Sequence, residues 1–168
     1  MKVTFEESEV WDDLLVPPSE IFKAFRKPEE FKNNKDIVVN PSCFPRMVLK
    51  KLSKKSIHKA VGECLCSTQY CQKSNIETEE VLKIRKEYWL KKNFAKDTSR
   101  NHFLKAKLES QWDKKKKKIE YRLAGSRLCQ AAFIKVIGCS KKKVQDCVKL
   151  CKSSGTMLDR VSTDIRID

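Results

Sequence analysis

The stretch FIKVIGCSKKKVQDCVKL, residues 133–150, constrains the fold more than any other part of the chain. Its first apolar residues repeat at helical spacing and stop at Gly138, a residue that adopts positive φ without steric strain. Ser140 is a favoured N-cap residue, and a second helical pattern follows it. The pattern predicts two short helices joined by a sharp turn, which is the arrangement of a helix–turn–helix.

The position of Gly138 determines which side chains this unit buries. If Gly138 lies in the turn, the inward positions are all apolar or thiol, namely Phe133, Ile137, Cys139, Val144 and Cys147. One position departs from the usual pattern, because Ile134 stands where a small residue normally lets the helices approach closely. We expect the two helices to pack through the inward face and to leave the opposite face to solvent.

The outward face of the second helix is rich in lysine. In helix–turn–helix proteins the first residues of the second helix contact base edges in the major groove, and flanking basic residues bind phosphates. Gln145, with Lys141 or Lys142, has the groups needed to pair with bases, whereas other lysines suit phosphate. A solvated face on an ordinary helical hairpin is the alternative. The candidate DNA-binding residues are Ser140, Lys141, Lys142, Lys143, Gln145 and Lys149.

The charge balance favours a polyanionic partner. The chain has 37 Lys and Arg against 22 Asp and Glu, a net charge of +15. Residues 1–20 hold six acids and one base, so the remaining 148 residues carry +20. Each phosphate that a cation neutralises releases condensed counterions, which favours binding. We therefore expect double-stranded DNA as the partner, although a protein that is merely basic and soluble has the same composition.

The sequence also bears on the compartment. No apolar run approaches the roughly 20 residues that span a bilayer, and the acidic N-terminus lacks the apolar core of a secretory signal. We expect a nuclear or cytoplasmic protein that is not secreted, does not associate with membranes and keeps its thiols reduced. The eight cysteines are then better explained by metal ligation or burial than by disulfides.

The segment CLCSTQYC, residues 64–71, predicts a metal site. Cys64, Cys66 and Cys71 are spaced to converge on one tetrahedral ion, for which zinc is the usual occupant, here in a structural role. The fourth ligand has to come from elsewhere in the chain, and we take His58 for it, with His102 and Cys43 as the other near candidates. The alternative is a set of buried or free thiols. The other cysteines, Cys129, Cys139, Cys147 and Cys151, are expected in the core.

The remaining patterns predict a mainly α protein. Apolar spacing predicts helices over about 79–94 and 99–112, packed as an antiparallel pair. Alternation in IEYRL and a turn at Ala124-Gly125 predict a short β-hairpin. We expect a small helical domain with a zinc knuckle, a short β-hairpin and a C-terminal helix–turn–helix. Its expected divisions are a weakly ordered acidic then basic arm (1–60), the cysteine cluster and helical pair (61–113), the hairpin and helix–turn–helix (114–155) and a tail (156–168).

In their order along the chain, these motifs resemble a known group of proteins. The segments RKPEEFKNN, the cysteine cluster, IRKEYWLKKNFAKDTSRNHFL, RLC and AAFIKVIGCSKKKVQDCV are similar to the N-terminal region of uncharacterised, transposon-derived animal proteins. The resemblance covers roughly residues 26–152 and rests on Arg85, Trp89, Phe103, Leu128, Cys129, Phe133, Gly138 and Ser140. It implies a DNA-recognition region. The transposase-like catalytic domain that follows in those proteins has no counterpart here, so we expect no enzyme.

Other functions are compatible with the same residues. An RNA or single-stranded nucleic-acid binder would use the basic arms together with aromatic stacking platforms, for which the candidates are Tyr70, Tyr88, Trp89 and Trp112. A protein-interaction adaptor would dock a partner through residues 1–20, with Trp11, Leu14 and Leu15 at the contact. The same acidic segment would alternatively fold back on the basic body. An enzyme is disfavoured, because the sequence has neither a phosphate-binding glycine loop nor a Ser–His or Cys–His signature.

Overall fold

The computed structural model describes residues 2–26, 36–90, 97–113 and 115–161. The predicted mainly α fold is confirmed. The N-terminal elements are β1 (Lys2–Phe5), α1 (Glu9–Asp12), α2 (Pro18–Phe25), β2 (Asp36–Val39), the 3-10 helix η2 (Pro41–Cys43), α3 (Arg46–Leu52) and α4 (Lys54–His58). They are followed by the 3-10 helix η3 (Lys73–Asn75), α5 (Thr78–Trp89), α6 (Asp97–Glu109), β3 (Trp112–Asp113), β4 (Lys118–Ile119), β5 (Arg122–Leu123), β6 (Ser126–Arg127), α7 (Gln130–Ile137) and α8 (Lys141–Val161).

Residues 1–60 differ most from the expectation of a weakly ordered arm. Within the described part of this segment, β1 pairs with β2 in parallel and a group of aromatic rings packs between the helices. The Trp11 ring lies 6.1 Å from that of Phe5 and 5.9 Å from that of Phe44, between centroids. Pro18 begins α2, where a proline is tolerated because the N–H groups of the first helical turn have no partner within the helix. The segment is therefore ordered by aromatic packing.

The acidic N-terminal segment folds back on α3 and α4. Leu14 forms a β-bridge with Ser53, and the backbone N of Lys54 donates to the carbonyl of Asp13 at 2.7 Å. Trp11 and Leu14 are each only 8% exposed. Two of the three residues considered for docking a partner thus belong to the core of this chain, whereas the third, Leu15, is partly exposed.

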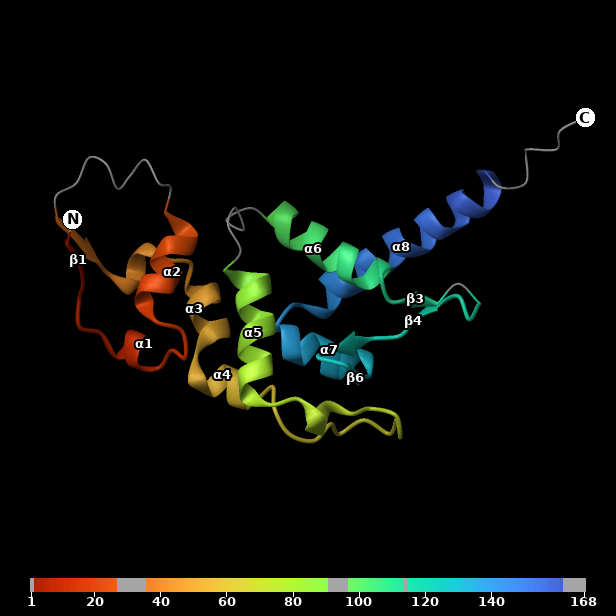
Figure 1. Ribbon diagram of the computed structural model, residues 1–168, viewed down its shortest axis with the longest axis horizontal. Coiled ribbons are helices and arrows are strands. Elements are labelled where there is room, and N and C mark those ends of the chain that lie inside the picture. Colours follow the sequence, from red (N-terminus) through yellow and green to blue (C-terminus); the bar gives the residue numbers. More distant parts are fainter. Residues whose placement is uncertain (1, 27–35, 91–96, 114, 162–168) are drawn as a thin grey trace, which may run out of the picture.

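Helix α5 stands in the middle of the molecule and contacts α3, α4, α6 and α7. Figure 1 shows it between the N-terminal elements and the group formed by α6, α7, α8 and the short strands. Buried side chains from the N-terminal elements through α8 form one continuous cluster. The divisions expected after residues 60 and 113 therefore do not separate independent cores.

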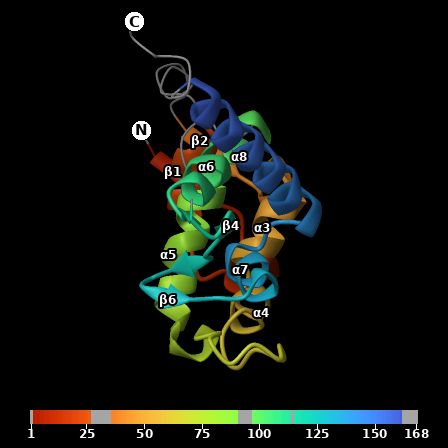
Figure 2. The ribbon, with the colours of Figure 1, turned by 90° about the vertical axis from the view of Figure 1, so that its right-hand side faces the viewer.

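The prediction that α5 and α6 pack as an antiparallel pair is wrong about the main partner of α6. Helix α6 packs mainly against α8, as Figures 1 and 2 show, and only in part against α5. Leu104 and Leu108 of α6 are fully buried, and Cys147 and Cys151 of α8 are each 4% exposed. The inner face of α5 is already covered by α3 and α7, which leaves α6 to cover α8. Helix α8 extends to Val161, beyond the expected end at 155, and residues 162–168 lie outside the described part.

Two short hairpins connect α6 to α7. The predicted hairpin is confirmed as β5 and β6, with Ala124 and Gly125 at positive φ in the turn. The second, β3 with β4, was not anticipated from the sequence. Among the described residues, no helix combines the length and the apolar character that crossing a membrane would require.

Candidate helix–turn–helix and metal centre

The chain turns at Gly138 as predicted. Helix α7 ends at Ile137, and Gly138 takes the left-handed conformation, with φ 77° and ψ 17°, while its N–H donates to the carbonyl of Ile134 at 2.9 Å. The hydroxyl of Ser140 then accepts from the N–H of Lys143 at 3.3 Å and caps the start of α8. The two helices are therefore separate elements, each ended or begun by the residue type that the sequence provides.

The predicted inward face of this unit is confirmed. Its side chains are all buried, with exposed fractions of 8% or less: Phe133, Ile137, Cys139, Val144 and Cys147. The unusual Ile134 is partly exposed, while Ala132, on the same helix, is buried. The bulky residue thus sits at the edge of the interface, which is why it does not hold the helices apart.

Two side chains of α5 bind the end of α7. Arg85 donates through Nε to the carbonyl of Val136 and through Nη2 to that of Lys135, both at 3.0 Å. Trp89 donates through Nε1 to the carbonyl of Ile137, also at 3.0 Å. The last carbonyls of a helix have no partner within it, and these three donors supply one to each.

Arg85 also holds α3 and α4 against the turn. Its Nη1 donates to the carbonyl of Lys51 and to the hydroxyl of Ser56, the latter at 2.8 Å. Burial lowers the pKa of Arg85 to about 10, so its guanidinium remains charged at neutral pH. A cation at the C-terminal end of α7 is also favoured by the helix dipole. Sequence reasoning missed this role; the available signal was an arginine four residues before a tryptophan on the apolar face of one helix.

Gly138 is enclosed by the same residues. A Cβ atom at this position would lie 3.3 Å from Cδ of Lys51 and 3.4 Å from Cζ of Arg85. Both the positive φ and the lack of space therefore require glycine here.

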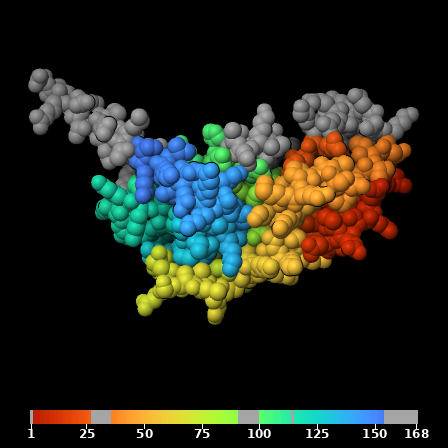
Figure 3. All heavy atoms as spheres, turned by 180° about the vertical axis from the view of Figure 1, so that it is seen from behind, coloured from red at the N-terminus to blue at the C-terminus, as the bar shows by residue number. Residues whose placement is uncertain are grey.

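The candidate DNA-binding face of α8 is directed away from the core. Val144, Cys147 and Cys151 face inward, and the side chains on the other side of the helix are exposed. Ser140, Lys141, Lys142, Gln145 and Lys149 are exposed, and Lys143 is partly buried. Figure 3 shows the start of α8, in blue, open at the surface of the molecule. The structure thus places all six predicted residues at or after the N-cap of α8, five of them exposed and Lys143 partly buried.

The thiols of the cysteine cluster come together in space. The Sγ atoms of Cys64, Cys66, Cys71 and Cys129 all lie within 4.8 Å of one another, and those of Cys64 and Cys129 are 3.6 Å apart. Four sulfurs around one zinc ion, at Zn–S distances of about 2.3 Å, would be about 3.8 Å apart. The group is therefore compatible with a tetrahedral metal site. Cys129 takes the fourth place that we had expected for His58, which is exposed at the end of α4 and is not part of the group.

Long-range contacts bring Cys129 to the other thiols. The backbone N of Gln72 donates to the carbonyl of Arg127 at 2.8 Å, and the N–H of Arg127 donates to the side chain of Gln72 at 3.0 Å. This double contact aligns η3 with β6, and Cys129 follows two residues later. No spacing rule relates a cysteine at 129 to a cluster at 64–71, so the sequence alone assigned it to the core.

A buried lysine shapes the loop before Cys64. The ammonium group of Lys73 donates to the carbonyls of Val61, Gly62 and Glu63 at 2.9, 2.8 and 3.4 Å. Its side chain is only 1% exposed, and these carbonyls replace the water that it has lost. Gly62 has φ 82°, as expected for a residue that lets the backbone bend around the cluster.

Cys129 belongs both to the cluster and to α7. It is the N-cap of α7, where its Sγ accepts from the N–H of Ala132 at 3.3 Å. Its own N–H donates to Sγ of Cys71 at 3.4 Å. The thiol cluster is therefore attached directly to the first helix of the helix–turn–helix.

The thiols differ in their tendency to ionise. The hydroxyl of Thr68 donates to Sγ of Cys66 at 2.8 Å and lowers the pKa of that thiol to about 6. Burial, followed by its hydrogen bond with Cys66, raises the pKa of Cys64 to about 12. The hydrogen bond from Thr68 thus favours the thiolate of Cys66, and a bound cation would favour the ionised form of the other thiols.

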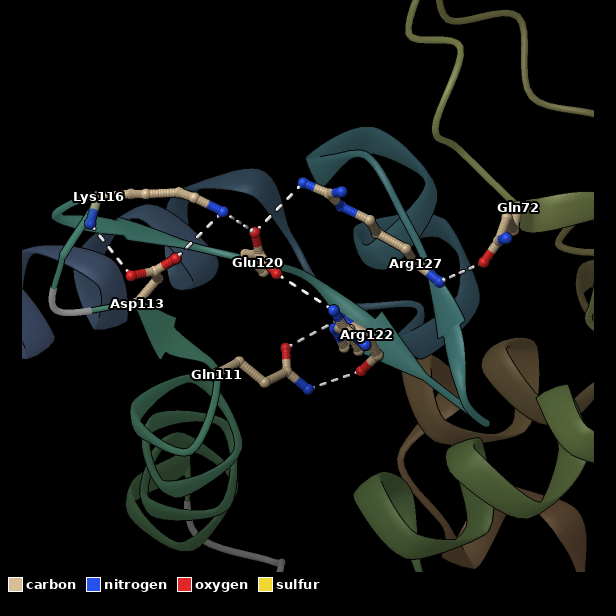
Figure 4. Close-up of polar contacts among 7 residues, drawn as sticks. All are labelled: Gln72, Gln111, Asp113, Lys116, Glu120, Arg122 and Arg127. Carbon is tan, nitrogen blue, oxygen red and sulfur yellow. Dashed lines mark hydrogen bonds and ion pairs between the residues drawn. The ribbon is translucent and has the colours of Figure 1, made fainter.

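A polar network fixes the strands between α6 and Cys129 (Figure 4). The carboxylate of Glu120 lies 3.2 Å from Lys116, 3.2 Å from Arg122 and 3.3 Å from Arg127. At the end of α6, the side chain of Gln111 accepts from the N–H of Arg122 and donates to its carbonyl. These contacts hold β5 and β6 between α6 and the loop that carries the thiols.

Comparison of the chain with protein-family models, with curated proteins and with solved structures returns no match.

Proposed function

We propose that this protein binds double-stranded DNA through the outward face of α8, and that it does so without catalysing a reaction. The observation that carries the proposal is the geometry of α8: its inner side is buried, its outer side is exposed and basic, and the left-handed Gly138 precedes it. This is the DNA-recognition role expected from the resemblance to transposon-derived proteins, and with it we propose the nucleus as the compartment, one of the two expected from the sequence.

The shape of α8 suits the major groove. An α-helix with its side chains is about 10–12 Å across, and the major groove of B-DNA is about 12 Å wide. Lys142, Gln145 and Lys149 recur at intervals of three and four residues, so they lie along one side of the helix. Gln145 has an acceptor and a donor for adenine, and the lysines donate to guanine or to phosphate.

We further propose that Cys64, Cys66, Cys71 and Cys129 hold a zinc ion with a structural role. Four sulfur ligands close the coordination sphere, which is typical of structural sites, whereas catalytic sites keep one position open. Through Cys129, the ion would fix the start of α7 and thereby the orientation of the helix–turn–helix. Elemental analysis of purified protein should give one zinc per chain, and protein free of zinc would refute the assignment.

Single-stranded nucleic acid is a poorer fit to the structure. Of the aromatic residues considered as stacking platforms, Tyr88 is fully buried, Trp89 is 3% exposed and Trp112 is partly exposed. Tyr70 is 46% exposed, but the guanidinium of Arg127 lies over its ring at 4.5 Å from the centroid. Competition between duplex DNA, RNA and single-stranded DNA for the protein should favour the duplex.

The test of the DNA proposal is selection of bound duplexes from a random pool, followed by mobility-shift titration. The parent protein should enrich a preferred sequence. The variant Lys141→Ala/Lys142→Ala/Gln145→Ala should bind duplex DNA without enriching it, because groups facing the bases are gone while other cations remain. Lys23→Ala/Lys83→Ala, on exposed positions of α2 and α5, removes the same charge as a control. Enrichment of the same sequence by the triple variant would contradict the role of α8.

A further inference from the structure

Helix α3 lies against the turn that precedes α8. The side chain of Lys51 is the nearest neighbour of Gly138, at 3.3 Å from the Cβ that any other residue would carry. Burial raises the pKa of Cys139 to about 11, and the positive charges of Lys51 and Lys143 act against this shift. The side chain of Lys51 in α3 thus lies at the turn that leads into α8.

The exposed side of α3 continues the positive surface of α8. Arg46 and Lys50 are exposed, and Lys51 is partly exposed. Within the described residues, no carboxylate lies within ion-pair distance of these three side chains. Burial, and then the neighbouring Arg85, lower the pKa of Lys51, as expected for a cation placed among cations. Figures 2 and 3 show α3 and the start of α8 side by side.

The positive surface ends on the far side of α3. There a groove of about 960 Å³ separates α3 from the N-terminal segment, with Arg46 and Lys50 in one wall and Glu9 and Asp13 in the other. A phosphate chain would be repelled by those carboxylates, so the favourable surface runs from α8 and the turn across α3 and ends at Arg46 and Lys50, on the α3 wall of the groove.

We propose that the phosphate backbone of bound DNA contacts a basic surface of α3, made up of Arg46, Lys50 and Lys51, next to the groove-facing helix α8. This proposal rests on the proposed DNA binding and adds a second, sequence-independent contact. The two phosphate chains that border the major groove run beside any helix inserted into it, and the elements flanking that helix are placed to meet them.

The test compares the salt dependence of binding. Each phosphate contact contributes about 0.9 to the slope of log K against log salt concentration. The variant Arg46→Gln/Lys50→Gln/Lys51→Gln should lower that slope by about 2–3 on every duplex while the enriched sequence stays the same. Lys23→Gln/Lys83→Gln/Lys115→Gln removes three exposed charges from α2, α5 and the β3–β4 connection, and its slope should change by less than one contact. Circular dichroism on both variants checks that the fold is kept.

The outcomes separate this proposal from the one it rests on. If the parent protein binds no duplex DNA, or binds only RNA, the proposed function fails. If the parent binds DNA through α8 but the α3 variant has the same slope as the control variant, only the α3 contact is refuted. If the α3 variant changes the enriched sequence instead of the slope, α3 faces bases and the proposed phosphate contact is likewise refuted.

Discussion

The helix–turn–helix (residues 130–151) and the cysteine knuckle (residues 61–76) are held together by different forces. In the helix–turn–helix, apolar and thiol side chains fill a common interface with the rest of the core. In the knuckle, the buried side chains are those of Lys73 and Ile76, and Leu65 is fully exposed. A segment with so little apolar burial does not offset the conformational entropy lost on folding, roughly 1–2 kcal/mol per residue for the backbone alone.

The comparison indicates where each region obtains its stability. The helix–turn–helix is stabilised by packing and by the hydrogen bonds that α5 makes to its turn. The knuckle depends on Lys73, on its pairing with β6 and, in our proposal, on the zinc ion held by the four thiols. Because Cys129 is both a member of the thiol group and the N-cap of α7, a change in the knuckle should reach the helix–turn–helix at that residue first.

The first prediction concerns Cys129, which links the knuckle to α7. Cys129→Ser removes a thiolate but keeps an N-cap, because serine is among the best capping residues. The change should lower zinc affinity by more than roughly 100-fold, since loss of an outer partner of a ligand already gives roughly 10–100-fold. Cys43→Ser, at an exposed thiol outside the cluster, is the matched control. Zinc-competition titration measures both, and equal affinities would show that Cys129 is not a ligand.

The next prediction concerns the helix–turn–helix and changes no cysteine. Arg85→Met keeps the apolar stem but leaves the carbonyls of Lys135, Val136 and Lys51 without their donor. Buried carbonyls that lose a partner cost about 1–3 kcal/mol each, so the free energy of unfolding should fall by at least about 3 kcal/mol. Lys83→Met, on the exposed side of the same helix, should stay within about 0.5 kcal/mol of the parent protein. Urea denaturation gives both values, and similar losses in the two variants would contradict the capping role.

The two regions also differ in how much the sequence could predict. In the helix–turn–helix, the sequence signals are local. Gly138 ends one helix, Ser140 begins the next, and the spacing of apolar residues predicts which side chains are buried. All of these were confirmed in place, because each depends on residues within about one turn of the helix. The donors Arg85 and Trp89 were missed, since nothing in their neighbourhood reveals which distant carbonyls they reach.

For the knuckle and the N-terminal segment, the deciding contacts are long-range. Three of the four clustered thiols were predicted from spacing, but Cys129 is brought in by Gln72 and Arg127, and His58 was named only because it lies nearby in sequence. The N-terminal segment was expected to be a weakly ordered arm, first acidic and then basic. Its order comes from aromatic side chains that meet across more than 30 residues, as Trp11 does with Phe44.

A smaller effect tests how closely α3 and α5 enclose the turn. Gly138 and Gly125 have nearly the same φ, 77° and 76°, but a Cβ at Gly125 would have no neighbour within 4 Å. Gly125→Ala should therefore cost about 1–2 kcal/mol for the left-handed conformation alone. Gly138→Ala should cost at least about 1 kcal/mol more, because Lys51 and Arg85 must also shift. Thermal unfolding measures the loss of stability in each variant, and the difference between the two losses is the cost of crowding at Gly138. Equal losses would show that a Cβ atom at Gly138 is accommodated without displacing Lys51 or Arg85.

The smallest expected effect separates the stability of the helix–turn–helix from its function. Ser140→Ala removes the cap of α8 and should cost about 1 kcal/mol, whereas Ser140→Asp keeps a capping oxygen and adds a charge that the helix dipole favours. The aspartate would nevertheless face the phosphates of bound DNA, so Ser140→Asp should fold as stably as the parent protein and bind duplex DNA more weakly. Ser140→Ala should do the opposite, with lower stability and nearly unchanged affinity for the folded fraction. Unfolding curves give the stability of each variant, and mobility-shift titrations give its affinity for duplex DNA. If affinity falls only in the variant that is less stable, the start of α8 does not lie against the DNA.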